Sequence, residues 1–215
     1  MSMSKLYGVP LSPMVRKVLL ALEIKQIDHE MVPVTPFRKP EGFEKISPLK
    51  KIPAWEDERV TLADSTVICE YLEDRYPEQP LYPKSPEDKA KARWFEEYAD
   101  TVMLPVLGTV FFERVAKKLV SQPADEVKVQ EILQTKLPKT CAYLESQVPE
   151  TGFLFGVSLQ LADIALATHF INLAHAGVNI EFAEYPRLAA YIDRLFQHPA
   201  VAHRIAEDKK VFGGK

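Results

Sequence analysis

Cysteine is scarce in this sequence: Cys69 and Cys141 are the only two among 215 residues. Two cysteines are too few for a disulfide framework, and their separation does not match the paired spacing of a zinc site. The five histidines are scattered, without a pair placed as in a zinc motif. We therefore expect reduced thiols in a reducing compartment and no bound metal.

The sequence also lacks a strong charge of one sign and any long apolar run. Its formal net charge of −3 argues against a surface built for nucleic acid or for an anionic membrane. Its apolar runs are far shorter than the ~20 residues that a membrane span requires. Its first residues show no charged segment followed by an apolar one, as a secretory signal would. These features predict a cytoplasmic protein with neither a nucleic-acid nor a membrane partner.

Proline, in contrast, is plentiful, and it gathers in one place. Residues 77–86 read PEQPLYPKSP, and four prolines in ten residues can neither continue a helix nor occupy a central strand. Short apolar runs alternate with helical patterns before this segment, whereas nearly everything after it has helical periodicity. We therefore predict a domain over 1–78, a linker over 79–86 and an all-helical domain over 87–215.

The first part of the chain reads as a small α/β domain. A β-favouring run at 5–9 is followed by apolar residues at helical spacing over 13–24 and by a second β-favouring run at 29–34. Ser12 suits the cap before that helix, and Pro13 suits its first position. A strand, a helix and a strand in so few residues predict a βαβ unit with a parallel pair of strands.

A second group of elements completes this domain. Two short runs at 52–55 and 59–62 flank acidic residues and predict a hairpin, after which Asp64 and Ser65 begin a helix. The order β-α-β followed by β-β-α predicts a thioredoxin-like sandwich. In the second part, the periodicity predicts helices at 86–118 (bent at Pro105 and Gly108), 123–148, 161–176, 187–196 and 199–207.

Four short stretches of sequence on the two sides of the proline-rich linker are informative together, through their order and spacing. They are 12–18 (SPMVRKV), 47–55 (SPLKKIPAW), 62–68 (LADSTVI), and 161–165 (LADIA) with 198–201 (HPAV). Through them the chain, from about Lys5 to Val211, resembles the cytosolic glutathione S-transferase superfamily. The first stretch is similar to the serine-type active-site segment of the phi, tau and zeta classes, and the chain resembles a bacterial member of this type. The resemblance implies an α/β thioredoxin-like N-terminal domain and an all-α C-terminal helical domain.

The resemblance assigns catalysis to Ser12. The free glutathione thiol has a pKa of roughly 8.5, so little of it is the nucleophilic thiolate at neutral pH. A hydroxyl at a helix N-terminus could donate a hydrogen bond to the sulfur, and the helix dipole would add positive potential there. Ser12 could instead be only a helix cap, worth about 1 kcal/mol. Tyr7 is a rival donor, although its place inside the first strand favours a core position.

The resemblance also implies a glutathione site. The bond between Ile52 and Pro53 is expected to be cis, and the Ile52 backbone would pair with the cysteinyl part of glutathione as a strand edge pairs with a peptide. The Ser65 hydroxyl and N–H would bind the γ-glutamyl carboxylate, and Asp64 would accept from the ammonium group. The alternatives are a plain proline at a strand entry and a plain helix cap.

The glycyl carboxylate of glutathione calls for a cation. Lys39 and Lys51 match positions that often fill this role in the family. Arg38 and Lys50 are neighbours that could substitute for them, although a solvated surface charge is the simpler reading of Lys50. Arg16 would support the site electrostatically or pair with a carboxylate.

Further expectations concern the helical part. Asp163 matches an aspartate that caps a buried helix, which is a stability role, and Gln160 stands where the family has Ser or Thr. The family implies a homodimer, with Trp94 among the candidate interface residues. An apolar electrophile is expected between the first-strand loop and the long helix, with the candidate lining residues Val9, Leu11, Tyr98, Val102, Leu107, Phe111 and Phe112.

Other functions use the same fold. A glutathione-dependent peroxidase or isomerase would use the same site, whereas a thiol reductase is disfavoured because Ser12 replaces the cysteine that mixed-disulfide chemistry requires. A non-catalytic adaptor, like the stringent-starvation-type regulators, would bind a protein and need not retain the glutathione contacts. We predict a glutathione S-transferase that uses glutathione as co-substrate, with its electrophile, class and pathway left open.

Overall fold

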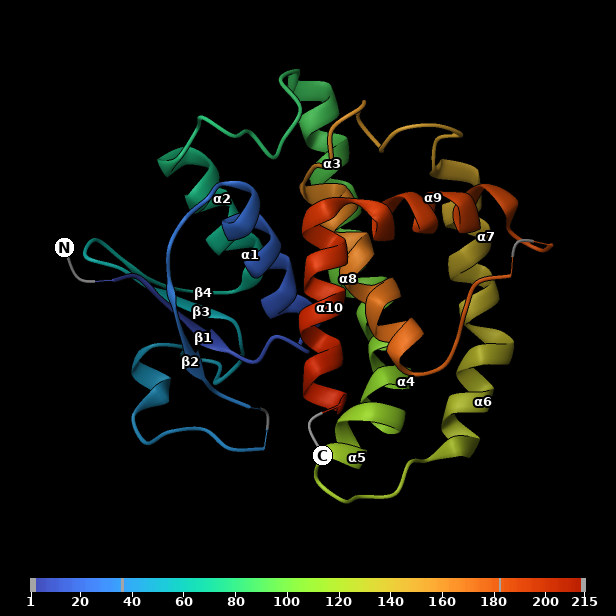
Figure 1. Cartoon of the computed structure of the whole chain (residues 1–215), viewed down its shortest axis with the longest axis horizontal. Helices are drawn as coiled ribbons and strands as arrows, with labels where there is room; N and C mark the ends of the chain where they lie inside the picture. Colours follow the sequence, from blue (N-terminus) through green and yellow to red (C-terminus); the bar gives the residue numbers. More distant parts are fainter. Residues whose placement is uncertain (1–2, 36, 182, 214–215) are drawn as a thin grey trace. The chain divides into compact units, whose positions relative to one another are not determined.

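The structure, a computed structural model, describes residues 3–35, 37–181 and 183–213, and the side chains up to residue 211 within them. The chain groups into two compact units, residues 1–82 with 206–215 and residues 83–205. They are termed the first unit and the helical unit (Figure 1).

The first unit is built on a mixed four-stranded sheet. Its strands are β1 (Lys5–Gly8), β2 (Glu30–Pro33), β3 (Ala54–Glu56) and β4 (Thr61–Ala63), in the spatial order β2-β1-β3-β4. Its helices are α1 (Pro13–Ile24), the short 3-10 turn η1 (Phe43–Lys45) and α2 (Ser65–Arg75). β1 pairs with β2 in parallel, and β3 is antiparallel to both β1 and β4. The predicted βαβ unit, hairpin and thioredoxin-like fold are confirmed.

The pleat of the sheet sorts its side chains between two layers. Tyr7 and Ala54 are paired across β1 and β3, and they share a buried cluster with Phe43 of η1. The neighbouring pair, Leu6 and Trp55, points to the opposite face and is fully buried. Figure 1 shows α1 and α2 on one side of the sheet and η1 on the other. The side chains of Leu6 and Trp55 therefore lie on the face of the sheet that α1 and α2 cover.

The end of α1 fixes the start of the proline-rich segment. The buried Lys25 ammonium lies 2.7 Å from the Glu73 carboxylate and donates to the carbonyls of Tyr76, at 2.8 Å, and Gln79, at 2.9 Å. Glu73 in turn accepts a hydrogen bond from the backbone N–H of Leu81 at 3.0 Å. A segment that prolines bar from regular structure is thus held by side-chain hydrogen bonds.

The regular secondary-structure elements of the second part of the chain, within the described residues, are all helical, as predicted. Its elements are α3 (Pro86–Tyr98), η2 (Ala99–Gly108), α4 (Thr109–Phe111), η3 (Phe112–Ala116), α5 (Lys117–Leu119), α6 (Glu126–Thr135), α7 (Leu137–Gln147), α8 (Leu161–His175), α9 (Pro186–Gln197) and α10 (Pro199–Gly213). The elements α3 to α5 form the predicted long helix, in which η2 and η3 are stretches of wider π-helical turns.

One predicted helix, over 123–148, is wrong: the structure has two helices there, α6 and α7, which meet at Lys136. Pro138 explains the break. It has no backbone N–H to continue the hydrogen bonding of α6, but it is tolerated in the first turn of a new helix.

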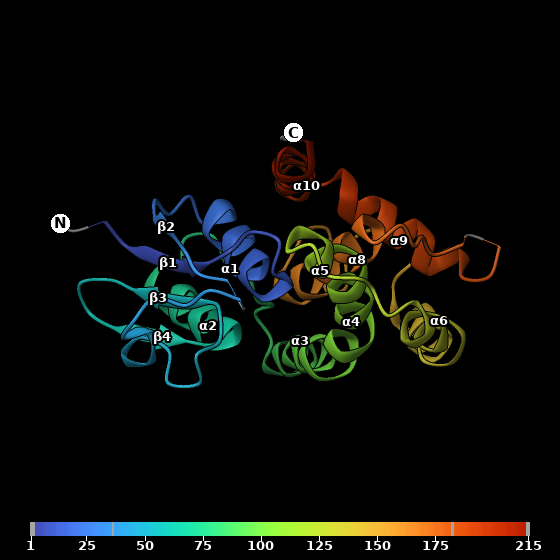
Figure 2. The same cartoon turned by 90° about the horizontal axis from the view of Figure 1, so that it is seen from below.

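The helix α8 is the centre of the helical unit. Every residue from Leu161 to Leu173 is buried, and α3, α4 and α9 pack around this helix (Figure 2). Its first turn is capped by Asp163, which accepts from the N–H groups of Leu154, at 2.9 Å, and Gln160, at 3.0 Å, and from the Tyr191 hydroxyl at 2.5 Å. The predicted capping role of Asp163 is confirmed, with Tyr191 as a partner that the sequence did not indicate.

The helix α10 is longer than predicted, because it continues past residue 207 to Gly213. Its residues from Ala206 onward group with the first unit. There the Asp208 carboxylate accepts from the Arg16 guanidinium of α1 at 2.6 Å, and both side chains are buried. Of the two roles expected for Arg16, pairing with a carboxylate is therefore the one observed.

Candidate glutathione site

Two helix N-termini meet in the first unit. Ser12 precedes the first turn of α1, which contains Met14, and Ser65 is the first residue of α2. The Ser65 hydroxyl lies 3.6 Å from the Met14 sulfur. The first backbone N–H groups of a helix have no partner within it, and the helix dipole makes this end positive. Two such ends side by side form a place suited to anionic groups of a ligand.

Ser12 occupies the cap position of α1 without capping the helix. Its backbone is extended, with φ −69° and ψ 127°, and its N–H donates to the Val9 carbonyl at 3.0 Å. The Ser12 side chain makes no cap hydrogen bond to the helix, whose first position is Pro13. A serine here ordinarily accepts a hydrogen bond from the backbone two or three residues on. The hydroxyl at this helix end is therefore not committed to a cap.

The N-terminus of α2 has a different construction. Asp64 has a φ of 82°, a left-handed conformation that a residue with a side chain rarely adopts. One oxygen of its carboxylate, Oδ1, accepts from the N–H groups of Thr66, at 2.9 Å, and Val67, at 3.4 Å. The Asp64 side chain thus caps α2 through one oxygen, and its Oδ2 takes no part in these bonds. Ser65 is nearly completely buried directly beside it.

A buried lysine whose role the sequence does not predict joins the two helices. Lys17 on α1 is fully buried, and its ammonium donates to the Thr66 hydroxyl in the first turn of α2 at 2.9 Å. A positive charge held in the protein interior strengthens the attraction of this helix end for an anion. The only signal in the sequence is a lysine, next to Arg16, within a helical stretch that is otherwise mostly apolar.

The segment before β3 presents a backbone edge. The Ile52–Pro53 bond is cis, as the resemblance implies. The buried Ser47 fixes the preceding residue, since its hydroxyl donates to the Lys51 carbonyl at 2.7 Å and accepts from the Lys51 N–H at 3.1 Å. Outside the strand ladders, the backbone of Ile52 makes no hydrogen bond with the described residues. Ser47 thus anchors this edge, a role that the sequence did not reveal.

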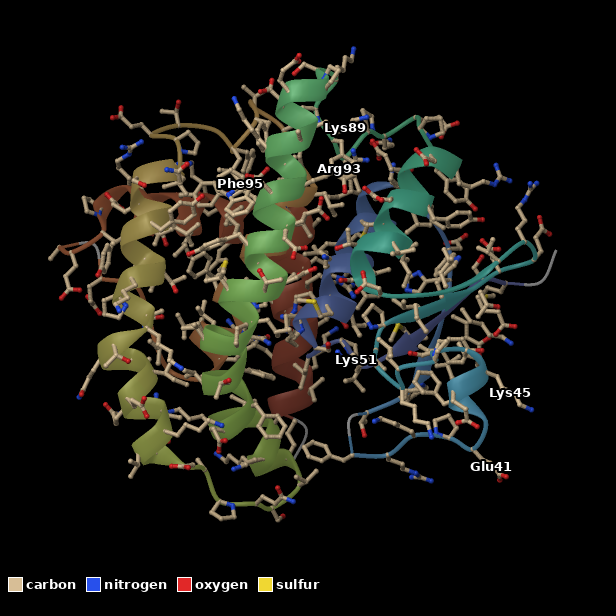
Figure 3. All side chains as sticks on the ribbon, turned by 180° about the vertical axis from the view of Figure 1, so that it is seen from behind. Glu41, Lys45, Lys51, Lys89, Arg93 and Phe95 are labelled. Atoms are coloured by element: carbon tan, nitrogen blue, oxygen red, sulfur yellow. The ribbon has the colours of Figure 1, made fainter. Side chains whose placement is uncertain are left out.

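The predicted cations lie at the surface of the first unit. Lys39 and Lys51 are exposed, and neither forms an ion pair within the described part of the chain. Figure 3 shows Lys51 well apart from the acidic Glu41. The Lys50 ammonium lies 3.6 Å from the Glu44 carboxylate in an exposed ion pair, and such pairs contribute little to stability. No hydrogen bond or ion pair of the described residues joins Lys39 to the two helix ends.

Tyr7 lies in the core, as its strand position predicts. Its hydroxyl donates to the Glu56 carboxylate, and its ring packs 6.2 Å from that of Phe43. Burial and the hydrogen bond to Glu56 raise the pKa of Tyr7 to about 12. Because the Tyr7 hydroxyl already donates its hydrogen bond to the Glu56 carboxylate, Tyr7 is a poor candidate for donating one to a glutathione thiolate.

The apolar residues proposed for an electrophile pocket differ in exposure. Leu11, Tyr98, Leu107 and Phe111 are buried, Val9 is half-buried, and Val102 and Phe112 are each 38% exposed. Their assembly into one pocket stays a prediction. Within residues 3–35, 37–181 and 183–213, no group of three His, Cys, Asp or Glu side chains could hold a metal ion, and no helix is long and apolar enough to span a membrane.

Comparisons with known proteins match both parts of the chain to one family. The family models "Glutathione S-transferase, N-terminal domain" and "Glutathione S-transferase, C-terminal domain" match residues 6–80 and 94–194. A glutathione S-transferase of Triticum aestivum is 30% identical over 200 residues, which cover 91% of this chain and 89% of that protein. A solved glutathione S-transferase from Rhodospirillum rubrum F11 is 25% identical, with a TM-score of 0.81 and coverage of 93% and 90%. Glutathione S-transferase-I, solved with lactoylglutathione bound, is 25% identical, with a TM-score of 0.80 and coverage of 95% and 99%.

Proposed function

The chain belongs to the cytosolic glutathione S-transferase superfamily, and on this premise we propose that it is a glutathione transferase. It binds glutathione where the N-termini of α1 and α2 meet and presents the thiol as a thiolate to an apolar electrophile. The observation that carries the proposal is Ser12, a hydroxyl at the cap of α1 that does not cap the helix, beside the N-terminus of α2.

Activation of the thiol requires a modest amount of free energy. Lowering its pKa from roughly 8.5 by about two units corresponds to about 2.7 kcal/mol of preference for the thiolate. A hydrogen bond from the Ser12 hydroxyl to a charged sulfur supplies about 1.5–3 kcal/mol, and the dipole of α1 adds about 0.3–1 kcal/mol. Ser12 keeps its own proton. The thiolate then attacks an electrophilic carbon, a C–S bond forms, and the leaving group departs with the bonding electron pair.

The rest of the site orients glutathione. The γ-glutamyl carboxylate accepts from the Ser65 hydroxyl and N–H, and the buried charge of Lys17 reinforces this contact through the first turn of α2. The ligand ammonium donates to Asp64, through the oxygen that does not cap the helix. A solved relative with lactoylglutathione bound supports a glutathione ligand in this family.

The cysteinyl and glycyl parts of glutathione take the opposite edge of the site. The cysteinyl backbone pairs with the N–H and C=O groups of Ile52, which Pro53 follows. The glycyl carboxylate meets the ammonium groups of Lys51 and Lys39, both of which are exposed and unpaired within the described residues. The proposal also includes a homodimer, for which Trp94, 54% exposed on α3, is a candidate contact.

Calorimetric titration of glutathione tests the binding site. Ser65→Ala should weaken binding about tenfold or more, because a hydrogen bond to a carboxylate is lost. Ser158→Ala, which removes an exposed serine of the helical unit, is the matched control and should bind as the wild type does. No binding at millimolar glutathione would overturn the proposal and favour a non-catalytic adaptor.

Absorbance of the thiolate against pH tests the role of Ser12. In the wild-type complex the thiol pKa should lie well below that of free glutathione, whereas in Ser12→Ala it should return to the free value with little change in affinity. Tyr7→Phe should leave the thiol pKa as in the wild type. A lowered pKa that survives Ser12→Ala would refute the catalytic role of Ser12 while leaving glutathione binding intact.

A further inference from the structure

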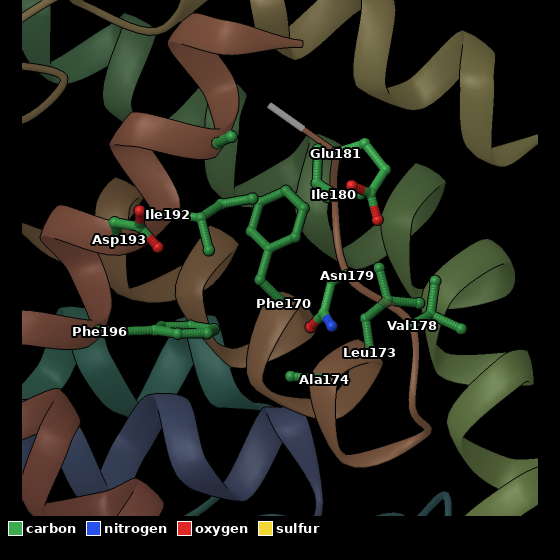
Figure 4. Close-up of a pocket in the computed structure, with 11 residues that line it drawn as sticks. Phe170, Leu173, Ala174, Val178, Asn179, Ile180, Glu181, Ile192, Asp193 and Phe196 are labelled. Carbon is green, nitrogen blue, oxygen red and sulfur yellow. The ribbon is translucent and has the colours of Figure 1, made fainter. Parts of the chain in front are cut away.

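The helical unit contains a cavity of its own. It has a volume of about 380 Å³ and is lined by residues of α8, α9 and the connection between them. Phe170 and Leu173 of α8 face it from one side, Ile192 and Phe196 of α9 from another, and Ile180 from the connection (Figure 4). This volume is within the range of about 300–1,000 Å³ typical of small-molecule sites. None of the lining residues belongs to the first unit, which carries the proposed glutathione site.

The charge of this cavity has one sign. Its ionisable lining residues are Glu181 and Asp193, and no Lys, Arg or His is among the described residues that line it. Figure 4 shows these two side chains on either side of the Phe170 ring. Both carboxylates are exposed, and neither forms an ion pair with any residue in the described part of the chain.

The arginines of α9 are committed elsewhere. Arg194, the neighbour of Asp193, donates to the carbonyls of Gly152, at 3.1 Å, and Pro149, at 2.7 Å. Arg187 donates to the Val148 carbonyl at 2.8 Å. These guanidinium groups donate to carbonyls of the 148–152 loop, so neither arginine of α9 is a counterion of Asp193 on the same helix or of Glu181 in the preceding connection.

We propose that this cavity binds a hydrophobic organic cation, namely an amine with an aromatic or branched aliphatic body. The body would occupy the apolar space between Phe170, Phe196 and Ile192, and the ammonium would be attracted by the negative potential of Glu181 and Asp193, which flank this space. The faces of the phenylalanine rings add a favourable contact with the cation. Glutathione and its conjugates carry a net negative charge and are a poor match for two carboxylates. The site therefore takes a different class of ligand from the proposed transferase site.

Three probes of equal shape separate charge from apolar burial. They are 4-phenylbutylamine, the neutral 4-phenylbutanol and the anionic 4-phenylbutyrate, each titrated by calorimetry into the full-length protein. We expect the amine to bind most tightly and the carboxylate most weakly, and added salt should narrow the difference between them. Equal affinities for the three probes, or no binding of the amine at millimolar concentration, would overturn the proposal.

Charge-neutral variants locate the site. Asp193→Asn and Glu181→Gln should each weaken amine binding about two- to fivefold, as expected for losing one exposed charge, and leave the alcohol unaffected. Glu131→Gln removes a carboxylate of the same unit that is also exposed and lies outside the cavity, and it is the matched control. Ala189→Leu, which fills the cavity, should abolish binding of both probes. Equal losses in the Glu131→Gln variant and in the cavity variants would refute this location.

Discussion

The buried ion pair between Arg16 and Asp208 offers the sharpest test of how α1 is held. The two side chains are 0% and 2% exposed, and the guanidinium and carboxylate are 2.6 Å apart. Breaking a buried pair by removing one partner costs about 3–5 kcal/mol, since the remaining charge stays in the interior. Asp208→Asn keeps the shape of the side chain and should therefore destabilise the first unit by about 3 kcal/mol or more. That is a large part of a total stability of about 5–15 kcal/mol.

The assay must report on the first unit, because two compact units need not unfold together. Trp55 is fully buried in β3 of the first unit, so its fluorescence in urea follows that unit once Trp94 is replaced by phenylalanine in every variant. Lys210→Gln is the matched control. This substitution removes the exposed ion pair with Glu207 on the same helix, in which the nitrogen and oxygen atoms are 2.5 Å apart. Exposed ion pairs contribute little to stability.

A double replacement separates the ion pair from side-chain packing. Arg16→Met with Asp208→Leu removes both charges, so no charge is left alone in the interior. This double variant should lose clearly less stability than the sum of the losses in the single variants Arg16→Met and Asp208→Leu. If Asp208→Asn costs no more than Lys210→Gln, or if the single effects simply add, the ion pair does not hold α10 against α1.

Three further predictions follow from buried groups. Because the pKa of Tyr7 is raised to about 12, the protonated hydroxyl contributes to stability below about pH 10, and this contribution is lost as the pH rises towards 12. In denaturant unfolding at pH 9–12, Tyr7→Phe should therefore lose less stability with rising pH than the wild type. Burial raises the pKa of the Cys141 thiol to about 12, so a disulfide reagent at pH 8 should leave Cys141 unmodified until urea unfolds the protein. Modification of Cys141 in the native state at the rate of free cysteine would contradict this prediction. Asp163→Ala leaves the buried Tyr191 hydroxyl and two partly buried backbone N–H groups without their acceptor, and it should lower the free energy of unfolding by about 3 kcal/mol or more. Tyr191→Phe removes only one of these donors and should cost about 1 kcal/mol, so equal costs of the two variants would contradict the network.

Local signals predicted the elements that place the site. Ser12 with Pro13 marks the beginning of α1, and Asp64 with Ser65 marks the beginning of α2, since caps and first-turn residues act within a few positions of the chain. The same kind of reasoning failed over 123–148. There the apolar spacing continues through the boundary between α6 and α7, and Pro138 gave the better signal.

Partners distant in the sequence could not be predicted in this way. A single sequence states that Arg16 is a cation but not that Asp208, 192 residues later, is its partner. It likewise shows no reason for Lys17 to meet Thr66, because that contact depends on how α1 packs against α2. These contacts are products of tertiary packing. Periodicity and capping rules describe single elements and cannot supply them.

The buried polar contacts of α1 have a common effect on the position of this helix. Three cationic side chains of α1 and its C-cap, Arg16, Lys17 and Lys25, are buried: the first pairs with a carboxylate of α10, and the two lysines reach the first turn and the later part of α2. Burying a cation is costly unless its partners are well placed, so apolar side chains would hold α1 to the sheet at lower cost. What polar partners add is direction, because hydrogen bonds and ion pairs fix both the rotation and the position of a helix.

Such positional control matters at the opposite end of α1. A hydroxyl that stabilises a thiolate must be held to within about 0.5 Å, whereas a surface that merely binds a protein tolerates more movement. If the buried cations serve this control, Lys25→Met should disturb the site although Lys25 lies at the far end of the helix from Ser12. The expected result is a thiol pKa of bound glutathione closer to the free value, with the affinity for glutathione nearly unchanged. An unchanged thiol pKa together with reduced stability would instead assign Lys25 to folding alone.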